Sequence, residues 1–502
     1  METFIDRVVN VSDFIWGGSW NGVPLLPFPP MVVALLGVGL YFMAGLRFYP
    51  LRQLFPALGG LFGRAGKGDG QGEISPFAAL STALSGQVGT GNLAGVATAI
   101  ALGGPGAIFW MWVTALIGMA LAFAEGALAI RFRERAPDGA WRGGPMTYII
   151  GGLGARWTWL AVLFCLGTLF SALVTGNGIQ SNSVADSIHG LTGWSDQIAG
   201  LIVAVLVFIV IIGGIRSIGA VAEKVVPLMA GAYIAMAITA ILLNLGSVPE
   251  AFGRILHGAF NPQAASGGFT GAAVLLAVRA GVARGLFSNE AGQGSTPIAH
   301  AVAQTSDPRV QGRFAMLGTF IDTIVICTMT ALVILTVEGA FTHTGPDGVA
   351  QPVLHAWQSD LQGFAVTSGA FAAAFPWQMA GIALGEVVVS VALILFVFTT
   401  LLTWSYYGER ALTFLYARMG GRSALGERRL HLAWRLIWCI AIFIGSYQDL
   451  TLVWRLGDIA NAAMALPNLV ALAALSGVVF AIARGRMDAV RRSAAGGPAE
   501  AQ

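Results

Sequence analysis

The chain has 502 residues, of which 56% are hydrophobic and 11% are charged. A soluble domain carries about 25% charged residues, so this much apolar side chain cannot all be buried away from water in an ordinary core. The formal net charge of +3 is too small to indicate a polyanionic partner. Composition therefore excludes a disordered chain, a disulfide scaffold and a nucleic-acid binder, and it predicts an all-α polytopic membrane protein.

The first residues, METFIDRVVNVSDFIW, lack the basic start and the long apolar stretch of a signal peptide. We expect them to form an amphipathic segment at the membrane interface. The three cysteines (Cys165, Cys327 and Cys439) lie far apart in apolar runs, and the six histidines are scattered. Neither pattern predicts a metal site made of cysteine or histidine.

A membrane-spanning helix needs about 20 mostly apolar residues. We expect about eleven such spans: 31–47, 76–101, 108–132, 156–187, 197–214, 222–244, 275–298, 313–336, 378–413, 430–447 and 450–484. The last of them contains Pro467, which could divide it into two.

Lys and Arg concentrate in alternate loops between these segments. Arg133, Arg135 and Arg142 follow the third span, for example, whereas the loop 339–377 has no Lys or Arg. Basic loops remain in the cytoplasm. If 450–484 crosses once, the pattern predicts a plasma-membrane protein with its N-terminus outside and its C-terminus in the cytoplasm.

Two apolar segments, 83–106 and 277–300, are unusually rich in glycine and polar residues. Each opens a block of five spans, and the charge pattern makes the two leading helices run in opposite directions. This pattern is typical of a five-plus-five inverted repeat whose first and sixth core helices are broken. The predicted organisation is 1–75 (interfacial segment, extra helix and basic linker), 76–244 (first repeat), 275–484 (second repeat) and 485–502 (cytoplasmic tail).

The glycines Gly86, Gly89 and Gly91 allow irregular backbone, which survives at membrane depth only inside protein or along a cavity. An interruption there frees N–H groups, which attract a carboxylate, and C=O groups, which coordinate a small cation. We therefore interpret Gly89-Thr90-Gly91-Asn92 as a binding site for a carboxylate ligand and a metal ion. The alternative is close packing of helices through small residues.

The corresponding segment of the second block, 285–292, contains the carboxylate Glu290 within an apolar span. Intramembrane carboxylates are costly and usually face a cavity or a partner. Arg279 and Arg284 are close in sequence and could pair with it. Glu290 is therefore interpreted either as an ion ligand or gate, or as half of a structural ion pair.

Amide, hydroxyl and aromatic side chains elsewhere could complete such a site. They are Gln180, Phe287, Asn289, Thr399, Thr400 and Trp404. The amides can bind either end of a zwitterion, threonine oxygens suit a hard cation, and Trp404 could cap an apolar pocket. Helix-end polarity, threonine back-bonding and ordinary packing are the alternatives.

Further acids lie within the apolar spans, namely Glu125, Asp322, Glu386 and Asp458. They could relay protons or could simply form structural pairs. Arg455 is a ready partner for Asp458 in sequence, as Arg410 is for Glu409.

Six stretches together resemble one known family. They are SGQVGTGNLAGVATAIALGGPGAIFWMW, GMALAFAE, RGGPMTYI, GIRSIGAVAEKVVPLMAGAYI, GLFSNEAGQGSTPIAHA and TTLLTWSYYGER. In this order, within residues 74–484, they look like the sodium:alanine symporters (the alanine or glycine:cation symporter family). The family implies the inverted-repeat architecture of the amino acid–polyamine–organocation superfamily, here with helix 31–47 preceding a ten-helix core.

The resemblance also implies roles for individual residues. Those implied to bind the substrate are Thr90, Gly91, Gln180, Phe287, Asn289, Thr400 and Trp404, and those implied to bind sodium are Ser85, Val88, Thr399 and Thr400. The N–H groups of Thr90 and Gly91 would meet the substrate carboxylate, and carbonyls freed at Gly285 would meet the ammonium. Phe287 and Trp404 would restrict the substrate side chain.

The function that the resemblance implies is Na⁺-coupled symport of alanine or glycine into the cell by alternating access, without an organic cofactor. Na⁺ fits better than H⁺ because the ion site needs no titrating group. A proton-coupled or differently selective amino-acid carrier is the alternative. An intramembrane enzyme and a channel are disfavoured, because no HExxH motif is present and two interrupted helices do not form a continuous pore.

Overall fold

The computed structural model describes residues 3–486, apart from 27, 62, 69, 137–138, 261–269, 346–347, 422 and 449. The predicted tail 485–502 therefore lies almost entirely outside the described residues. Within the described part, the chain is helical, and its strands form four short antiparallel pairs in the loops.

The helices of the first half are α1 (Phe4–Gly17), α2 (Pro30–Gly45), α3 (Tyr49–Leu61), α4 (Arg64–Lys67), α5 (Pro76–Gln87), η1 (Gly91–Gly95), α6 (Val96–Gly103), α7 (Gly106–Arg131), α8 (Pro145–Leu153), η2 (Ala155–Trp157), α9 (Thr158–Leu173), η3 (Val174–Gly178), α10 (Ile179–Thr192), α11 (Asp196–Ile211) and α12 (Gly214–Leu243). Those of the second half are η4 (Leu245–Ser247), α13 (Val248–Phe260), α14 (Thr270–Asn289), α15 (Thr296–His300), α16 (Pro308–Thr319), η5 (Phe320–Cys327), α17 (Thr328–Thr336), η6 (Ala356–Gln358), α18 (Phe364–Ala374), α19 (Leu384–Arg418), α20 (Ala424–Gly445), α21 (Leu450–Ala474) and α22 (Ser476–Ala483).

The paired strands are β1 (Ser19–Trp20) with β2 (Val23–Pro24), β3 (Glu134–Arg135) with β4 (Trp141–Arg142), β5 (Phe341–Thr344) with β6 (Ala350–Val353), and β7 (Gln378–Met379) with β8 (Ile382–Ala383). In the longest pair, Phe341 lies opposite Val353. All four pairs connect helices and contribute nothing to the interior of the bundle.

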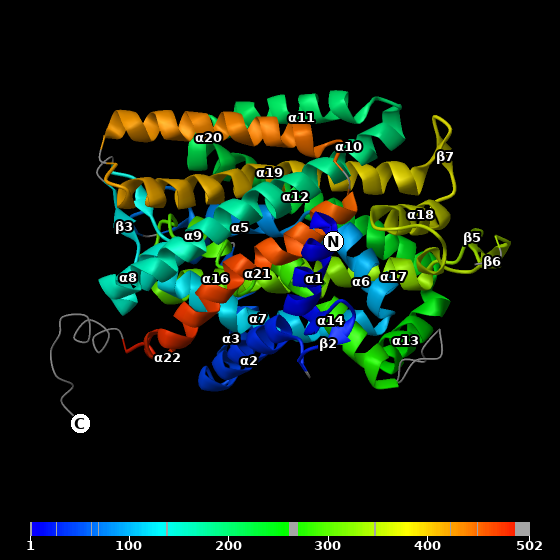
Figure 1. The fold of residues 1–502 in the computed structure, drawn as a ribbon, viewed down its shortest axis with the longest axis horizontal. Helices are drawn as coiled ribbons and strands as arrows, with labels where there is room; N and C mark the ends of the chain where they lie inside the picture. The colour runs from blue at the N-terminus through cyan, green and yellow to red at the C-terminus, as the bar shows by residue number, and fades with distance from the viewer. Residues whose placement is uncertain are drawn as a thin grey trace.

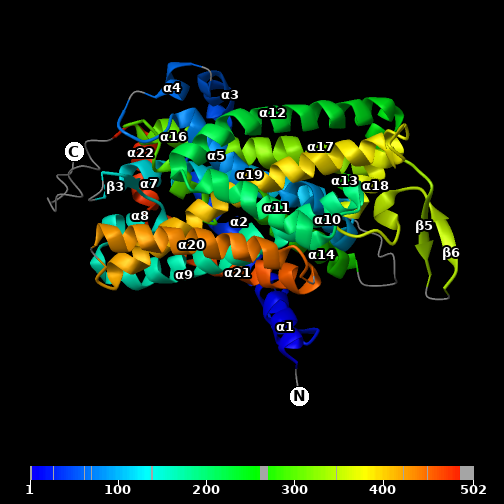
Figure 2. The same ribbon diagram turned by 90° about the horizontal axis from the view of Figure 1, so that it is seen from above.

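The long helices lie side by side along one direction, so that loops form both ends of the molecule (Figure 1). Figure 2 shows, in the perpendicular view, that the axes of α12, α17, α19 and α20 lie along this same direction. Six helical stretches of the described chain are long and apolar enough to cross a membrane: Gly106–Arg131, Ala155–Thr192, Gly214–Leu243, Pro308–Thr336, Leu384–Arg418 and Leu452–Ala474. The pair α2 and α3, bent by 77°, would make a seventh. The protein is therefore an all-helical membrane protein with several apolar spans.

The remaining predicted spans coincide with shorter, interrupted or less apolar helices, so the count of eleven stays a prediction. These helices are α5 with α6, α11, α14 and α20. One predicted limit was wrong, and one alternative is excluded. The span 378–413 begins only at Leu384, because β7 and β8 turn around Gly381 at a φ of 85°. Pro467 does not divide the last span, since α21 continues through it to Ala474.

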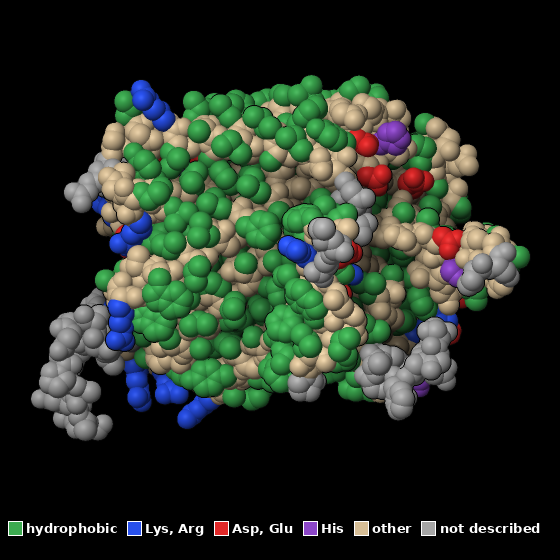
Figure 3. All heavy atoms as spheres, viewed as in Figure 1, with side chains coloured by type: hydrophobic (Ala, Val, Ile, Leu, Met, Phe, Trp, Pro, Cys, Tyr) green, Lys and Arg blue, Asp and Glu red, His purple; other side chains and the backbone are tan. Residues whose placement is uncertain are grey.

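Apolar side chains cover the flank of the bundle that Figure 3 shows, and charges gather at its ends. Leu201 and Ile209 on α11 and Leu228 on α12 are exposed, as expected for side chains that face lipid. Most of the visible Lys and Arg lie at the end that carries β3 and α22. Most of the visible Asp, Glu and His lie at the end that carries β5 and β6 (Figures 1 and 3).

The helix that leads into the candidate site is enclosed by protein. α5 begins where Ser75 Oγ accepts a hydrogen bond from the N–H of Ala78 at 3.0 Å, with Pro76 in the first turn. From Ala78 to Gln87 every residue is buried, and so is all of η1. An interruption at this position is therefore shielded from lipid, as unpaired backbone groups require.

Candidate functional site

The first interruption lies between α5 and η1. α5 ends at Gln87, and Val88 adopts an extended conformation with φ −78° and ψ 101°. The chain then resumes as the π-helix η1, a rare form that is frequent at functional sites. The N–H of Gly89 is bound by Asn92 Oδ1 at 2.8 Å. A Cβ atom at Gly89 would lie 2.7 Å from Thr400 Oγ1 and 2.9 Å from Gln180 Oε1, so only glycine fits.

The second interruption lies between α14 and α15. Glu290, Gly292 and Gly294 adopt positive φ angles of 56°, 84° and 88°. The helix ends at Asn289, so the predicted segment 285–292 begins too early. The expectation that Gly285 frees its carbonyl was wrong, because Gly285 lies inside α14 and packs against α7, where its Cβ would be 3.3 Å from Thr114. Glycine content alone does not end a helix; three left-handed residues do.

The two interruptions meet in space although they are about 200 residues apart. Gln87 Nε2 donates to the carbonyl of Asn289 at 2.5 Å, across 202 residues of sequence. Gly91 lies against Phe287, whose Cδ1 would be 2.9 Å from a Cβ on the glycine. Close approach of the two segments is thus the reason for glycine at position 91.

A polar cluster joins the same two segments to a third helix. Asn92 Nδ2 donates to Asp322 Oδ1 at 2.6 Å and to Ser288 Oγ at 3.1 Å. Ser288 donates in turn to Asp322 Oδ2 at 2.7 Å. Asp322 lies in the π-helix η5 and is fully buried. Among the described residues it has no ion pair, so its carboxylate is satisfied by an amide and hydroxyls.

Thr90 and Gln180 come together as the resemblance implied. The backbone N–H of Thr90 donates to Gln180 Oε1 at 3.1 Å, and the Thr90 hydroxyl donates to the same atom at 2.9 Å. Gln180 stands near the start of α10, directly after the π-helix η3. The amide oxygen of Gln180 therefore occupies the position at which a ligand oxygen would accept from the freed N–H of Thr90.

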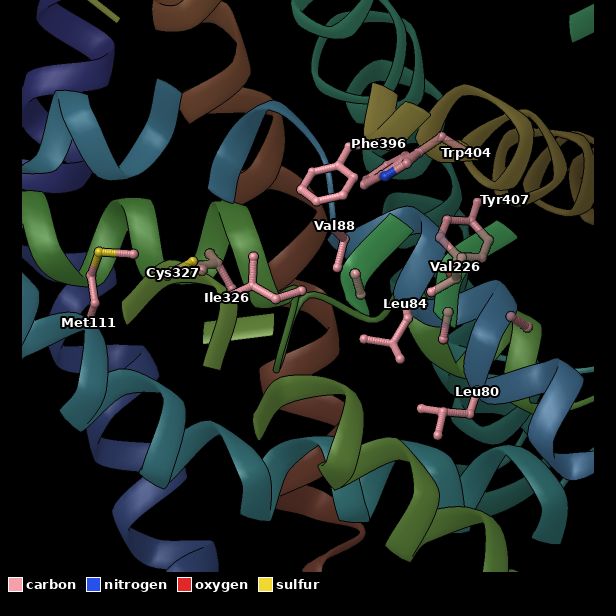
Figure 4. Packing of buried hydrophobic residues seen from close by; sticks show 14 of the residues in the cluster. Leu80, Leu84, Val88, Met111, Val226, Ile326, Cys327, Phe396, Trp404 and Tyr407 are labelled. Carbon is pink, nitrogen blue, oxygen red and sulfur yellow. The ribbon is translucent and has the colours of Figure 1, made fainter. Parts of the chain in front are cut away.

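Four oxygen atoms gather beside the first interruption. Thr400 Oγ1 donates to the carbonyl of Val88 at 3.1 Å and to that of Phe396 at 2.9 Å. Thr399 Oγ1 lies 3.0 Å from the same Phe396 carbonyl. Figure 4 shows Val88, Phe396 and Trp404 close together.

One atom of this oxygen group was not predicted. The expected group of Ser85 is its backbone carbonyl, and its hydroxyl is directed away, to Thr403 and to the carbonyl of Thr82. Phe396 was missed, because a carbonyl ligand has no side-chain signature. The available signal was spacing, since Phe396 lies one turn before Thr400 on α19.

The aromatic residues of the predicted set are buried around these atoms. Trp404 is 2% exposed, and its Nε1 lies 3.0 Å from Glu290 Oε1 and 3.3 Å from the carbonyl of Gly86. The Phe287 ring lies 4.8 Å from that of Trp454. Asn289 Nδ2 donates to Thr323 Oγ1 at 3.1 Å. The structure thus brings every predicted site residue into one buried region.

Of the two interpretations of Glu290, the structural ion pair with Arg279 or Arg284 was wrong. Arg284 Nη2 binds both carboxylate oxygens of Asp458, at 2.7 and 2.8 Å, and Arg279 binds Asp13. Arg284 precedes Glu290 by six residues and lies on another face of the helix, and Arg279 precedes Glu290 by eleven residues, about 16 Å along the helix axis.

Of the two other ion pairs expected between neighbours in sequence, one is absent and one is present. Arg455 pairs with Asp13 at 3.0 Å and not with Asp458 as expected. The expected pair of Arg410 and Glu409 is present at 2.8 Å, and Arg435 joins it at 2.8 Å.

Separate contacts anchor the second interruption and the segment that follows α15. Glu125 of α7 is fully buried and accepts from Asn468 Nδ2 at 2.6 Å and from the N–H of Gly292 at 3.2 Å. Arg133, in the loop after α7, donates to the carbonyls of Gln71, Ala301, Ala303 and Thr305 at 2.7 to 3.1 Å. Burial lowers the pKa of Arg133 to about 10, so its guanidinium stays protonated at neutral pH.

A cavity of about 310 Å³ lies elsewhere, at the end of the bundle that carries β3. Glu134, Arg142, Thr147, Arg410 and Arg418 are among the residues that line it, and none of the predicted substrate or sodium residues does. The candidate residues instead pack directly against one another.

Two interrupted helices that are buried inside an apolar helical bundle and contact each other through a freed backbone carbonyl are typical of membrane carriers. The chain belongs to the sodium:alanine symporter family, whose model matches residues 19–494. It is an amino-acid/cation symporter and a multi-pass membrane protein.

Two relatives cover nearly the whole chain. A transporter of Haemophilus influenzae without assigned function is 42% identical over 478 residues, which are 95% of this chain and 95% of that protein. The sodium/alanine symporter AgcS of Methanococcus maripaludis is 40% identical over 478 residues, covering 95% of this chain and 96% of AgcS. A solved structure of MhsT in complex with L-phenylalanine shares the fold, with a TM-score of 0.54, 14% identity, and coverage of 82% of this chain and 89% of MhsT.

Proposed function

We propose that this protein carries alanine and glycine into the cell together with Na⁺. The observation that supports this most directly is the junction of Thr90, Gln180 and Thr400 at the first interruption. There, a freed backbone N–H and a group of neutral oxygens lie side by side. A carboxylate suits the first and a small hard cation suits the second.

In this proposal the substrate carboxylate replaces Gln180 Oε1 at the N–H of Thr90 and also accepts from the N–H of Gly91. The ammonium binds at the C-terminal end of α14, where helix carbonyls carry partial negative charge. Asn289 lines this end of the pocket, and its carbonyl, which now accepts from Gln87 Nε2 at 2.5 Å, is one such group. Phe287 and Trp404 limit the space for the side chain, which favours alanine and glycine.

Na⁺ is bound by the carbonyls of Ser85 and Val88 with the hydroxyls of Thr399 and Thr400, and the Phe396 carbonyl adds a fifth oxygen. Thr400 donates to the Val88 carbonyl in the cation site and also lies against Gly89, beside the carboxylate site. It therefore belongs to both sites. Because Thr400 belongs to both sites, binding of either ligand raises the affinity for the other. Symport requires this reciprocal coupling.

The proposed architecture is a five-plus-five inverted repeat, 76–244 and 275–484, preceded by the region 1–75. The two interruptions, one in each block, support it. The concentration of Lys and Arg at the end that carries β3 supports a cytoplasmic location for that end, with the N-terminus outside and the tail 485–502 inside the plasma membrane (Figure 3). Rocking of one helix group against another would alternate access to the site.

Counterflow tests the carrier and its substrate. Proteoliposomes that contain the full chain are loaded with unlabelled alanine and diluted into labelled alanine with Na⁺ on both sides. We expect transient accumulation of label, competed by external glycine. No exchange of alanine or glycine in Na⁺ would contradict the proposal.

A second candidate function is a proton-coupled or differently selective amino-acid carrier. The observation that favours it is that Glu290 and Asp322 are buried carboxylates without an ion pair among the described residues. Alanine accumulation driven by a pH gradient in Na⁺-free buffer would favour it.

A further inference from the structure

Glu290 is a buried side chain that the proposed transport cycle does not use. It is 2% exposed and has a φ of 56°, a conformation that non-glycine residues rarely adopt. Of the five non-glycine residues with positive φ in the described chain, it is the only buried one. Such strain persists only where surrounding contacts hold the residue in place.

Both oxygens of the Glu290 carboxylate are engaged by neutral donors. Oε2 accepts from the hydroxyl of Ser295, which lies at the far side of the same interruption. Oε1 accepts from Trp404 Nε1 at 3.0 Å, across 114 residues of sequence. Glu290 therefore connects the second interruption to α19, the helix that also carries Thr399 and Thr400.

The indole of Trp404 is confined on its other sides. Its Nε1 also lies 3.3 Å from the carbonyl of Gly86, at the end of α5. A Cβ at Gly176 in η3 would lie 2.5 Å from the indole, and the Tyr407 ring stands edge-on to it at 5.6 Å. Packing thus limits where the ring can go, and the bond to Glu290 selects one direction for its N–H edge.

We propose that Glu290 is a positioning residue that fixes the Trp404 indole as the wall of the substrate pocket and thereby sets the largest side chain that can be carried. This inference rests on the proposed function, in which Trp404 limits the space for the substrate side chain. A hydrogen bond is directional, so an acceptor at this distance fixes the orientation of the indole N–H edge, which packing alone does not select.

The length of the side chain matters, because an oxygen must lie within hydrogen-bond distance of the indole N–H. Two conservative variants therefore give different expected results. Glu290→Gln keeps an oxygen at the same distance, and its amide can donate to Ser295. Glu290→Asp keeps the charge but withdraws the oxygens by one carbon. Glu125→Gln is the matched control, because Glu125 is an equally buried carboxylate on the same interruption but contacts Asn468 and Gly292 instead of Trp404.

The experiment compares alanine with valine and leucine in full-length protein. Uptake in proteoliposomes gives kcat/KM, and the rise in Tm on ligand addition gives binding independently of transport. We expect Glu290→Asp and Trp404→Phe each to lower the ratio of kcat/KM for alanine over valine about tenfold, the usual value of one or two methylene groups in a pocket. Glu290→Gln should retain most of the selection for alanine. The double variant Glu290→Asp with Trp404→Phe should select no more weakly than Trp404→Phe alone, because both changes remove the same hydrogen bond.

The failures are distinguishable. If the wild-type protein neither carries nor is stabilised by alanine in Na⁺, the proposed function is wrong and this inference falls with it. If wild-type protein selects alanine but Glu290→Asp selects equally well, or Glu125→Gln relaxes selection to the same degree, only the role of Glu290 is overturned. Should Glu290→Asp not fold, unchanged selection in Trp404→Phe would overturn it instead.

Discussion

The two interrupted helices differ in the atoms that they offer. The groups that contact Val88 and Gly89 directly are backbone N–H and C=O, an amide and hydroxyls, and the carboxylate of Asp322 is linked to them through Asn92. Around 290–295 the backbone is held by two buried carboxylates, Glu290 and Glu125. The first interruption is thus built from neutral groups that a zwitterion and a cation can replace, and the second is built from bonds that hold helices in place.

This difference explains why so much of the second interruption is already satisfied. Asn289 bonds to Thr323, Gly292 to Glu125, and Glu290 to Trp404. A buried carboxylate without a cation is costly, and hydrogen bonds from several donors offset that cost. At the second interruption, ligand contacts would come from the C-terminal end of α14. Most of the polar side chains there instead hold neighbouring helices together.

Blocking the first interruption should have the largest effect. Gly89→Val places methyl groups where Thr400 Oγ1 and Gln180 Oε1 already lie, 2.7 and 2.9 Å from the new Cβ. We expect alanine uptake to fall below detection while the protein still inserts in the membrane. Gly231→Val is the control, since Gly231 has open space around its Cβ position and should transport normally. Normal uptake by Gly89→Val would disprove the importance of the interruption.

Placing a charge at the carboxylate position should have the next largest effect. In Gln180→Glu, a carboxylate would accept from the N–H and hydroxyl of Thr90 and would repel the substrate carboxylate. We expect the KM for alanine to rise about a hundredfold, the factor that nearly 3 kcal/mol produces. Gln293→Glu, in another buried amide of the same region, controls for charge alone. A KM that stays within threefold of wild type would remove Gln180 from the substrate site.

Removing one cation ligand should have a moderate effect. Thr399→Ala deletes a hydroxyl that lies 3.0 Å from the Phe396 carbonyl. We expect the Na⁺ concentration for half-maximal uptake to rise about tenfold, equivalent to 1.4 kcal/mol, with a smaller change in the alanine KM at saturating Na⁺. Thr336→Ala removes a buried hydroxyl with a similar bond to its own helix, away from the site, and serves as the control. An unaltered Na⁺ curve would exclude Thr399 as a ligand.

The smallest effect on transport should come from the loop that anchors the segment after α15, where the expected loss is one of stability. Arg133→Gln removes hydrogen bonds to four carbonyls and should cost about 2–3 kcal/mol of stability, because bonds to charged groups are strong and buried carbonyls lose their partner. We expect Tm in detergent to fall by several degrees. Arg135→Gln, in the exposed strand β3, should leave Tm unchanged. Equal Tm values for both variants would show that the anchor is unimportant.

Sequence patterns predicted the helical membrane fold and the first interruption well, because their causes are local. Apolar length identifies spans, and the glycines at 86, 89 and 91 mark the break between Gln87 and Thr90. The second interruption was displaced by about five residues. Its position depends on a left-handed Glu290, which propensity disfavours and which only tertiary contacts with Ser295 and Trp404 stabilise.

Partners that are distant in sequence were out of reach. Arg284 pairs with Asp458 and Arg279 with Asp13, at separations of 174 and 266 residues, so proximity in the chain suggested the wrong acid. The Phe396 carbonyl was overlooked for a different reason, since every residue has a carbonyl and only its spacing of one helical turn from Thr399 and Thr400 could have identified it.

The central claim is that interrupted helices expose peptide groups to an amino acid and a monovalent cation at once. Accumulation of labelled alanine in proteoliposomes, with an inward Na⁺ gradient or with choline in its place, tests it most directly. The account predicts that alanine rises above its external concentration only with the Na⁺ gradient, and that Gly89→Val abolishes this rise. Equal accumulation in choline, or in Gly89→Val, would contradict it.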